Sequence, residues 1–366
     1  MVEWKPLNKI VKSISTGLNP RQNFILNEED ASLYYVTVKE ITTNKVVFSK
    51  STDRITENAK QIINNRSKLS KGDILFSGIG TIGKVAYVDI STNNWDCSES
   101  VFLIKPNELE TNGKYLAFIL SSDVAKNQYE RGAAGAIMKG VRKATLENLL
   151  IPIPSLEEQT RIVGILDTFT SAIDNLKEQI AQRRKQYEYY RDQLINKAFS
   201  LFSSIYLKDV AIIKNGKDYK ELGIGDIPVY GSGGIMTYVD TYASDSPSVL
   251  LPRKGSVENI FYVEKPFWTV DTIYWTDIDC TRIIPKYLFY ALLIYNLKDY
   301  AYGGARPSLS QPILYKLRIP LPPLSEQQRI VSILDTFEAS ISNLEAQLKE
   351  RDKQYEYYRN KLLTFE

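Results

Sequence analysis

The segment Gly78–Lys84 reads GIGTIGK and fits two phosphate-binding patterns, Gly-x-Gly-x-x-Gly and Gly-x-x-x-x-Gly-Lys. A phosphate loop leads from a strand into the N-terminus of a helix, and the second pattern also needs Ser or Thr after the lysine to hold Mg²⁺. Here Val85 follows, and the chain continues with the strand-like run Lys-Val-Ala-Tyr-Val. We therefore predict a hairpin turn that presents Thr81 and Lys84, rather than a nucleotide site.

A second segment of chemical interest is Arg131–Lys143, which carries cations and glycines but no acidic residue. Glycines let the backbone approach phosphates, and Lys or Arg side chains release counterions from nucleic acid. The corresponding later segment is Tyr302–Gln311, where Arg and Gln could pair with guanine and adenine edges. The alternative is that these are ordinary solvated loop charges. The candidate DNA-contacting residues are Thr81, Lys84, Arg131, Lys139, Arg142, Lys143, Arg253, Lys254, Arg306, Ser308 and Gln311.

The composition argues against catalysis by this chain. It has no histidine and only two cysteines, which are far apart and fit no metal-ligand spacing. No Asn-Pro-Pro-Tyr methyltransferase motif and no carboxylate–lysine nuclease cluster occurs. We expect a protein that is not an enzyme and binds no cofactor or metal. With a net charge of +3, no signal peptide and no apolar run of about 18 residues, it is expected to be cytoplasmic, without a membrane partner.

The elements that must position these loops form a long internal repeat. Residues 151–195 align without a gap with residues 319–363, and ILDTF and KQYEYYR recur identically. Prolines precede each copy, and Ser155 with Glu158 has the spacing of a helix-capping box. Ser325 with Gln328 offers the same spacing in the second copy. Each copy predicts one helix of about 40–45 residues, roughly 60–65 Å long.

Apolar and aromatic residues recur along both predicted helices at alternating steps of four and three, which is a coiled-coil seam. The seam consists of Ile162, Leu166, Phe169, Ile173, Leu176, Ile180, Tyr187, Tyr190 and Leu194, and of Ile330, Leu334, Phe337, Ile341, Leu344, Leu348, Tyr355, Tyr358 and Leu362. Arg183 and Arg351 occupy the one longer step in each copy. Each helix can bury its seam against the other. The block between them has an expected radius of gyration of about 13 Å, too small to return the chain roughly 60 Å, so we predict antiparallel pairing.

Two globular blocks complete the chain. Short β-rich runs separated by turns, followed by helical periodicity from Tyr115 to a glycine, predict an α+β block. Residues 74–89 resemble 249–264 in pattern, and 114–120 resemble 286–292, so the second block is a divergent copy. We predict an α+β fold with pseudo-twofold symmetry: domains at 1–150 and 200–318, joined by spacer helices at 151–199 and 319–366. Two recognition domains on a rigid spacer suit duplex DNA with two half-sites.

The sequence resembles the specificity subunit of type I restriction-modification systems. The resemblance rests on paired Ile-Pro-x-Pro-x-Leu-x-Glu-Gln junctions, Arg-Ile-Val-x-Ile-Leu-Asp helix starts and Tyr-Glu-Tyr-Tyr-Arg helix ends. It rests also on Lys71–Lys84 and Ile227–Gly234, and it covers nearly the whole chain. Many members carry Arg where Gly78 stands, and Arg253 fills the counterpart in the second block.

The resemblance implies two target recognition domains, each reading half of a bipartite sequence in double-stranded DNA. Two modification subunits would use S-adenosylmethionine to methylate adenine N6, and restriction subunits would supply ATP- and Mg²⁺-dependent cleavage. Alternatives are a type IIB-like specificity subunit or a coiled-coil adaptor that binds something other than DNA. Residues expected at a subunit interface are Arg183, Tyr187, Tyr190, Arg351, Tyr355 and Tyr358. The competing interpretations are a register-fixing role for the arginines and packing against a recognition domain for the tyrosines.

Overall fold

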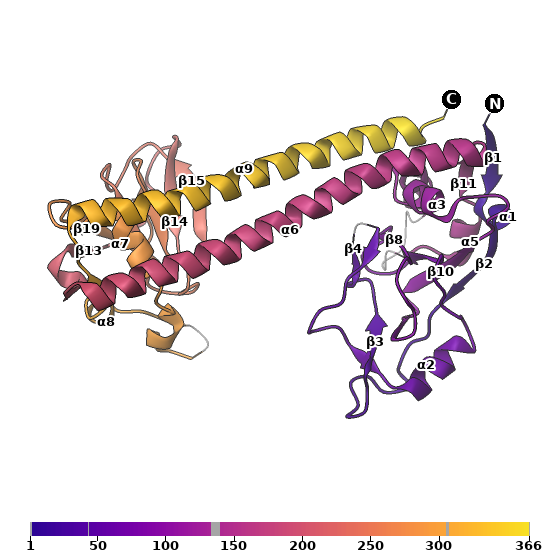
Figure 1. Cartoon of the computed structure of the whole chain (residues 1–366), viewed down its shortest axis with the longest axis horizontal. Helices are drawn as coiled ribbons and strands as arrows, with labels where there is room; N and C mark the ends of the chain where they lie inside the picture. The colour runs from indigo at the N-terminus through magenta and orange to yellow at the C-terminus, as the bar shows by residue number, and fades with distance from the viewer. Residues whose placement is uncertain (1, 43, 133–139, 305–306, 366) are drawn as a thin grey trace. The chain divides into compact units, whose positions relative to one another are not determined.

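The computed structural model describes residues 2–42, 44–132, 140–304 and 307–365. The chain forms two compact units. Unit 1 contains Met1–Asn175 and Leu348–Glu366, and unit 2 contains Leu176–Gln347. Two long helices, α6 (Leu156–Leu201) and α9 (Leu324–Leu363), therefore contribute to both units (Figure 1).

In unit 1 the main sheet has four antiparallel strands in the order β2-β10-β7-β8. These strands are β2 (Val11–Thr16), β10 (Val101–Pro106), β7 (Ile74–Ser77) and β8 (Val85–Tyr87). A second sheet has the order β6-β3-β9, with β3 and β9 parallel. It consists of β6 (Arg54–Ile55), β3 (Leu33–Val36) and β9 (Trp95–Cys97). Two strand pairs complete the unit: β4 (Ile41–Thr42) with β5 (Lys45–Val46), and β1 (Glu3–Pro6) with β11 (Leu150–Ile153).

The helical part of unit 1 corrects one prediction, because the single helix expected from Tyr115 is two helices. The hydroxyls of Ser121 and Ser122 bond back to the carbonyls of Phe118 and Ile119 at 2.9 and 2.7 Å, which competes with continuation of the helix. The helices of the domain are α1 (Leu7–Ile10), α2 (Glu57–Asn64), α3 (Gly113–Leu120), α4 (Asp123–Gly132) and α5 (Lys143–Glu147).

Unit 2 repeats this plan. Its main sheet has the order β13-β19-β16-β17, and its second sheet, β15-β14-β18, again pairs two strands in parallel. The strands are β12 (Ser204–Tyr206), β13 (Ala211–Asn215), β14 (Ile227–Gly231), β15 (Gly234–Val239), β16 (Ser248–Pro252), β17 (Phe261–Val263), β18 (Trp268–Thr269), β19 (Ile273–Ile278) and β20 (Arg318–Pro320). The helices are η1 (Leu207–Asp209), α7 (Pro285–Leu292), η2 (Leu297–Tyr300) and α8 (Gln311–Leu314). The sequence echoes between 74–89 and 249–264 thus correspond to equivalent strands.

The two junctions where the long helices begin are built identically. Gln159, fully buried, accepts from the backbone N–H of Asn112 at 2.8 Å and donates to the Pro154 carbonyl at 2.9 Å. Gln327, also fully buried, does the same with Ile284 and Pro322, at 2.8 and 2.9 Å. Each glutamine therefore fastens the start of a helix to the globular domain of its own unit.

The caps of these helices bear out one prediction and correct another. Ser155 Oγ accepts from the backbone N–H of Glu158 at 3.3 Å, which is the predicted cap of α6. The predicted cap at Ser325 is wrong. Helix α9 begins at Leu324, and the Pro323 carbonyl accepts the first helical N–H bonds at 2.9 and 3.0 Å. Proline fits there because the first residues of a helix need no intrahelical donor.

Within each unit the two long helices run antiparallel, as Figure 1 shows for the end of α9 beside the start of α6 in unit 1. Phe169 stacks on Tyr358 in unit 1 with ring centres 5.2 Å apart, and Tyr190 stacks on Phe337 in unit 2 at 5.4 Å. Apolar seam residues join the cores of the same units, Ile162 and Leu166 in unit 1 and Ile330 and Leu334 in unit 2. The predicted fold class is confirmed.

Candidate nucleic-acid interface

The segment Gly78–Lys84 is the turn of the β7–β8 hairpin, as predicted, and no helix follows it. Gly80 and Gly83 have φ values of +83° and +81°, which only glycine adopts without strain. Ser77 closes the turn, because its hydroxyl donates to the Thr81 carbonyl at 2.6 Å and accepts from the Lys84 N–H at 2.8 Å. The geometry is that of a rigid turn and not of a loop that wraps a nucleotide phosphate.

The hairpin turn is joined to the second candidate segment of unit 1. Ile79 and Gly140 form an antiparallel bridge, and the N–H of Val141 donates to the Gly78 carbonyl at 2.8 Å. A Cβ atom at Gly78 would lie 2.4 Å from the Phe102 ring, so an arginine here would require that ring to move. The structure therefore brings together two segments that lie about 60 residues apart in the chain. Lys139 lies outside the described residues.

Unit 2 contains the same arrangement at equivalent positions. Lys254 bridges Ser308, and the N–H of Leu309 donates to the Arg253 carbonyl at 2.9 Å. The Gly255 N–H adds a longer bond to the Pro307 carbonyl at 3.3 Å. Arg306, the remaining candidate cation of this loop, lies outside the described residues. We call the paired segments 78–84 with 140–143, and 253–255 with 307–311, the loop pairs.

The candidate side chains of unit 1 differ in how free they are to reach a ligand. Arg131, in the last turn of α4, and Arg142, just before α5, are exposed. Lys143 forms an exposed ion pair with Glu147 at 3.6 Å, which costs little to break. Thr81 is exposed at the hairpin tip. Lys84 instead turns inward, since its Nζ donates to the Val38 carbonyl at 2.9 Å.

In unit 2 the candidates are more tightly held. Lys254 forms an ion pair with Asp271 at 3.5 Å, while Arg253 donates to the Asp271 carbonyl at 3.2 Å and lies 5.8 Å from the Tyr274 ring centre. Gln311 donates to Asn215 Oδ1 at 3.4 Å. Nucleic acid would compete with these contacts. Ser308 sits on the paired backbone itself, where its N–H and carbonyl bond to Tyr302 at 2.8 and 3.0 Å.

Two exposed side chains at the loop pairs were not among the predicted residues. Ile79 is 49% exposed in the hairpin turn, and Tyr302 is 57% exposed beside Ser308. An apolar side chain can contact a thymine methyl, and a tyrosine hydroxyl can bond a phosphate. The tyrosine was visible in the sequence next to two glycines, but its exposure depends on the pairing with Ser308.

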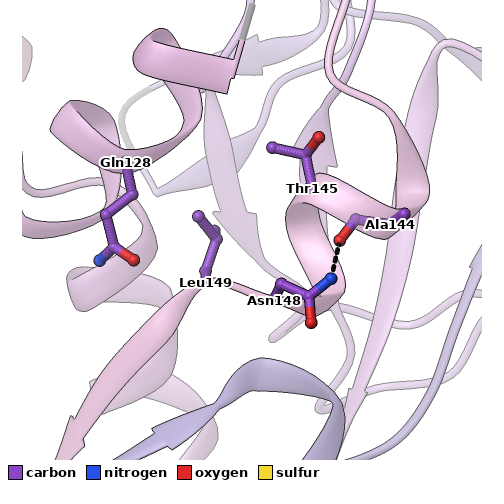
Figure 2. A pocket seen from close by; sticks show the side chains of 5 residues that line it. All are labelled: Gln128, Ala144, Thr145, Asn148 and Leu149. Atoms are coloured by element: carbon purple, nitrogen blue, oxygen red, sulfur yellow. Dashed lines mark hydrogen bonds between the residues drawn. The ribbon is translucent and has the colours of Figure 1, made fainter.

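An open pocket of about 370 Å³ lies near this region of unit 1 (Figure 2). Gln128 of α4 faces it from one side, and Thr145 and Asn148 lie on and after α5. Asn148 Nδ2 donates to the Ala144 carbonyl at 2.8 Å, and the Gln128 amide bonds the backbone of Leu150 at 2.9 and 2.8 Å. None of these side chains ionises, so the pocket has no group for acid–base chemistry.

The predicted interface residues make contacts inside the chain. The Arg183 guanidinium lies 5.9 Å from the Phe337 ring centre, and that of Arg351 lies 6.0 Å from the ring of Phe169. The Tyr187 hydroxyl donates to Glu338 Oε1 at 3.3 Å. Tyr355 is buried, whereas Tyr190 and Tyr358 are 46% and 40% exposed. The exposed tyrosines keep a face toward solvent, and a role with another subunit stays a prediction.

Groups for metal or thiol chemistry are sparse. Within the described ranges, no cluster of three or more His, Cys, Asp or Glu side chains could hold a metal ion. Cys97 and Cys280 are both free, and burial raises the pKa of the Cys97 thiol. Among the helices of the described residues, none combines the length and apolar character that a membrane span requires.

Comparison with known proteins shows which family shares this sequence and architecture. The family model described as "Type I restriction modification DNA specificity domain" matches twice, at residues 1–183 and 201–351. A putative type I restriction enzyme specificity subunit of Haemophilus influenzae is 32% identical over 70% of this chain and 70% of its own. The putative type I restriction enzyme MjaX specificity subunit of Methanocaldococcus jannaschii is 26% identical over 99% of this chain and 92% of its own.

Solved structures share the fold. The crystal structure of a type I restriction-modification S subunit from M. genitalium superposes with a TM-score of 0.62 at 19% identity, covering 100% of this chain and 97% of that one. A chain from a structural study of complex assembly and conformational transition of the type I R-M system gives 0.60 at 18% identity, covering 99% and 97%. With its two recognition units, its paired helices and these relatives, this chain belongs to the type I restriction-modification specificity subunit family.

Proposed function

We propose that this chain selects a bipartite sequence in double-stranded DNA, with one half-site read by the loop pair of each unit. The observation that supports the proposal is the repeated geometry. In both units a cation-bearing segment (140–143 in unit 1, 253–255 in unit 2) is joined backbone to backbone, at equivalent positions, to a segment distant in sequence. Such pairing holds backbone N–H groups, cations and hydrogen-bonding side chains on one rigid edge, where phosphate contacts can position the loops and side chains can meet base edges.

The helices would serve as spacer and scaffold. Stacking at Phe169–Tyr358 and Tyr190–Phe337 fixes the pairing of α6 with α9 in each unit. We propose that this pairing sets the half-site spacing and that two modification subunits, and restriction subunits beyond them, assemble on the exposed helix surface. S-adenosylmethionine, ATP and Mg²⁺ would then belong to those partners, and this chain would contribute specificity without catalysis.

The proposal is tested with the chain assembled with its cognate modification subunits on a library of random duplexes. In unit 1 Arg142→Ala with Lys143→Ala, and in unit 2 Arg253→Ala with Lys254→Ala, should each weaken binding. Each lost phosphate contact should reduce the salt dependence of binding by about one ion. Selectivity should relax only in the half-site of the altered unit. The matched control is Lys9→Ala with Lys12→Ala, which removes two exposed cations of unit 1 that lie outside the loop pair and outside the long helices.

Deleting one heptad, Asp174–Ile180, from α6 tests the spacer. The selected half-sites should remain the same while their separation changes, or recognition should be lost. An unchanged target after the deletion, or equal loss of selectivity in both half-sites after a loop change in one unit, would contradict the proposal. Finding no sequence-selective binding by the assembled complex would favour an adaptor that binds something other than DNA.

A further inference from the structure

Unit 1 contains a cavity of about 320 Å³ whose lining shares only Gly83 and Lys84 with the loop pair. It lies where the end of α9 meets the recognition domain. Tyr355 and Arg359, one turn apart on α9, line it together with Asn44 of the β4–β5 turn and Lys84 of the β7–β8 hairpin. A cavity of this size is at the lower end of the range for small-molecule sites, roughly 300–1,000 Å³.

Three polar atoms around this cavity are buried without a partner. Tyr355 is only 5% exposed, and its hydroxyl forms no hydrogen bond. The Nε of Arg359 and the Oδ1 of Asn44 are likewise buried and unpaired. Burial raises the pKa of Tyr355, and the neighbouring Arg359 and Asn44 lower this pKa in part. Neither neighbour, however, has the geometry of a hydrogen bond to the Tyr355 hydroxyl. Buried polar groups are normally satisfied, so a cluster of unpaired ones points to a missing ligand.

Unit 2 shows what the hydroxyl lacks. Tyr187, which occupies the position of Tyr355 in the helix repeat, donates to the Glu338 carboxylate at 3.3 Å. The residue of unit 1 that corresponds to Glu338 is Thr170, whose hydroxyl donates instead to the carbonyl of Asp167 at 3.1 Å. Unit 1 therefore has the tyrosine without the carboxylate that binds it in unit 2.

The Arg359 guanidinium also lacks the carboxylate that its counterpart in unit 2 has. Arg191, the unit 2 counterpart of Arg359, pairs with Asp192 at 2.8 Å. The residue after Arg359 is Asn360, which is uncharged and has its own buried oxygen unpaired. Two carboxylates that serve this position in unit 2 are thus absent from unit 1, while both of the groups that they bind remain.

The cavity consequently carries excess positive charge. Among the described residues no carboxylate lies within ion-pair distance of Arg359 or Lys84. The Asp167 carboxylate is near enough to raise the pKa of Tyr355, but it is neutralised by Lys114 at 2.6 Å. The Lys84 ammonium bonds only a backbone carbonyl. A cavity that has two cations, a free hydroxyl and no acid of its own selects an anion.

We propose that this cavity binds a phosphate group, either as free phosphate or on a small phosphorylated molecule. The Arg359 guanidinium and the Tyr355 hydroxyl would donate to phosphate oxygens, since guanidinium donors match phosphate geometry. Lys84 supplies additional charge, and Asn44 Oδ1 accepts from a protonated oxygen or from a hydroxyl of the organic part. The bound group would connect the end of α9 to the β7–β8 hairpin, whose turn belongs to the loop pair.

Binding is measured on the full-length chain by calorimetric titration and thermal unfolding with inorganic phosphate, against sodium chloride at matched ionic strength. Saturable binding is expected, with Arg359→Gln weakening it at least tenfold. Arg191→Gln, the same change in unit 2, is the matched control and should leave it unchanged. A parallel titration with glycerol phosphate separates the two sources, because tighter binding than that of phosphate identifies a phosphorylated small molecule and equal binding identifies free phosphate.

Two further variants remain informative if Arg359→Gln is poorly folded. Tyr355→Phe removes only the unpaired hydroxyl and should weaken phosphate binding without lowering the melting temperature. Thr170→Glu restores the carboxylate found in unit 2 and should abolish the phosphate response in a folded protein. The proposal is overturned if the wild-type protein shows no saturable binding of phosphate, or if Arg359→Gln and Arg191→Gln weaken it equally. It is also overturned if saturable binding is seen only when duplex DNA is titrated in place of phosphate.

Discussion

Units 1 and 2 agree closely in their backbone and apolar contacts and differ in their ionisable side chains. Tyr115 donates to the Pro152 carbonyl at 2.8 Å in unit 1, and Tyr287 donates to the Pro320 carbonyl at 3.0 Å in unit 2. Around the helix ends, however, unit 2 satisfies its tyrosine with Glu338, whereas Tyr355 of unit 1 faces a cavity. Shape and register are thus held by repeated packing, and charge placement is where the copies have diverged.

The largest expected difference between the units is the pH response of Asp96, a buried carboxyl group of unit 1. Asp96 is fully buried, its Oδ1 accepts the Cys97 N–H at 2.8 Å, and its Oδ2 has no partner. Burial raises the pKa of Asp96 to about 7, although the Cys97 N–H and the charge of Lys60 oppose this. At the matching position after the tryptophan, unit 2 has Thr269, which does not titrate in this range.

The sign of the pH effect follows from the direction of this shift. An unfolded aspartate titrates near pH 3.9, so between about pH 4 and 7 the folded unit holds a proton that the unfolded chain releases. The stability of unit 1 should therefore fall as pH rises through this window. Asp96→Asn should remove the part of the dependence that Asp96 contributes and stabilise unit 1 at pH 8 by up to about 4 kcal/mol.

Urea unfolding at pH 5 and pH 8, read by pulsed hydrogen exchange, reports the two units separately and so measures this prediction. Thr269→Val is the control in unit 2 and should leave the pH dependence of both units unchanged. The prediction fails if wild-type unit 1 and the Asp96→Asn variant change equally in stability between pH 5 and pH 8. That result would show that the Asp96 carboxylate has a partner in solution.

The second prediction concerns the feature that the units share most closely. Gln159→Met and Gln327→Met each remove the side-chain partner of one backbone N–H and of two backbone carbonyls. Each change should destabilise its own unit by about 2–4 kcal/mol, and the two costs should agree within about 1 kcal/mol. Unfolding of the two single variants measures both values. A large loss in one unit beside a small loss in the other would mean that the two junctions are not equivalent.

The sequence was sufficient to predict features that depend on local spacing. The seam of Ile162, Leu166 and their repeats specifies long helices because helical periodicity is a property of neighbouring residues. Val85 after Lys84 was enough to distinguish a hairpin from a phosphate loop. The limited reach of the block between the helices was enough to predict antiparallel pairing. These inferences needed no knowledge of which distant residues touch.

Features that depend on distant contacts were missed. The bridge between Ile79 and Gly140 forms across the sheet, so the sequence could nominate both segments without joining them. The helix break at Ser121 is a local feature that was also missed, because the hydroxyls of Ser121 and Ser122 bond the carbonyls three residues earlier. The cavity beside Tyr355 had a signal in the repeat, because Thr170 stands where the other copy has Glu338. That signal can be interpreted only once the antiparallel pairing of the helices is known, because it is the Tyr187–Glu338 bond of unit 2 that links the two positions.

The third prediction tests the polar contacts that unit 2 has retained. The Tyr290 hydroxyl donates to Asp335 Oδ1 at 2.7 Å, and Lys286 pairs with the same carboxylate at 2.9 Å. Unit 1 has Phe118 in place of this tyrosine. Tyr290→Phe should therefore cost unit 2 about 1–2 kcal/mol, measured by urea unfolding. Tyr189→Phe, on a ring that is 61% exposed, is the control and should cost almost nothing. Equal losses would mean that the Asp335 contact contributes nothing beyond solvent.

The smallest expected effect separates a structural role from a partner-binding role for the two seam arginines. Arg183 lies over Phe337 and Arg351 over Phe169 at nearly the same distance, 5.9 and 6.0 Å. Cation–π contacts at partly exposed sites contribute about 0.5–1 kcal/mol, so Arg183→Met and Arg351→Met should each reduce stability by about 0.5 kcal/mol and equally. If the arginines only fix helix register, assembly with modification subunits should weaken no more than this small loss of stability predicts. A loss of assembly out of proportion to stability, in titrations of the two variants with those subunits, would instead place the arginines in the interface. The apolar packing is the same in both units, whereas the charged side chains differ. A loss of assembly in only one of the two variants would therefore identify the unit whose helix surface binds the modification subunit.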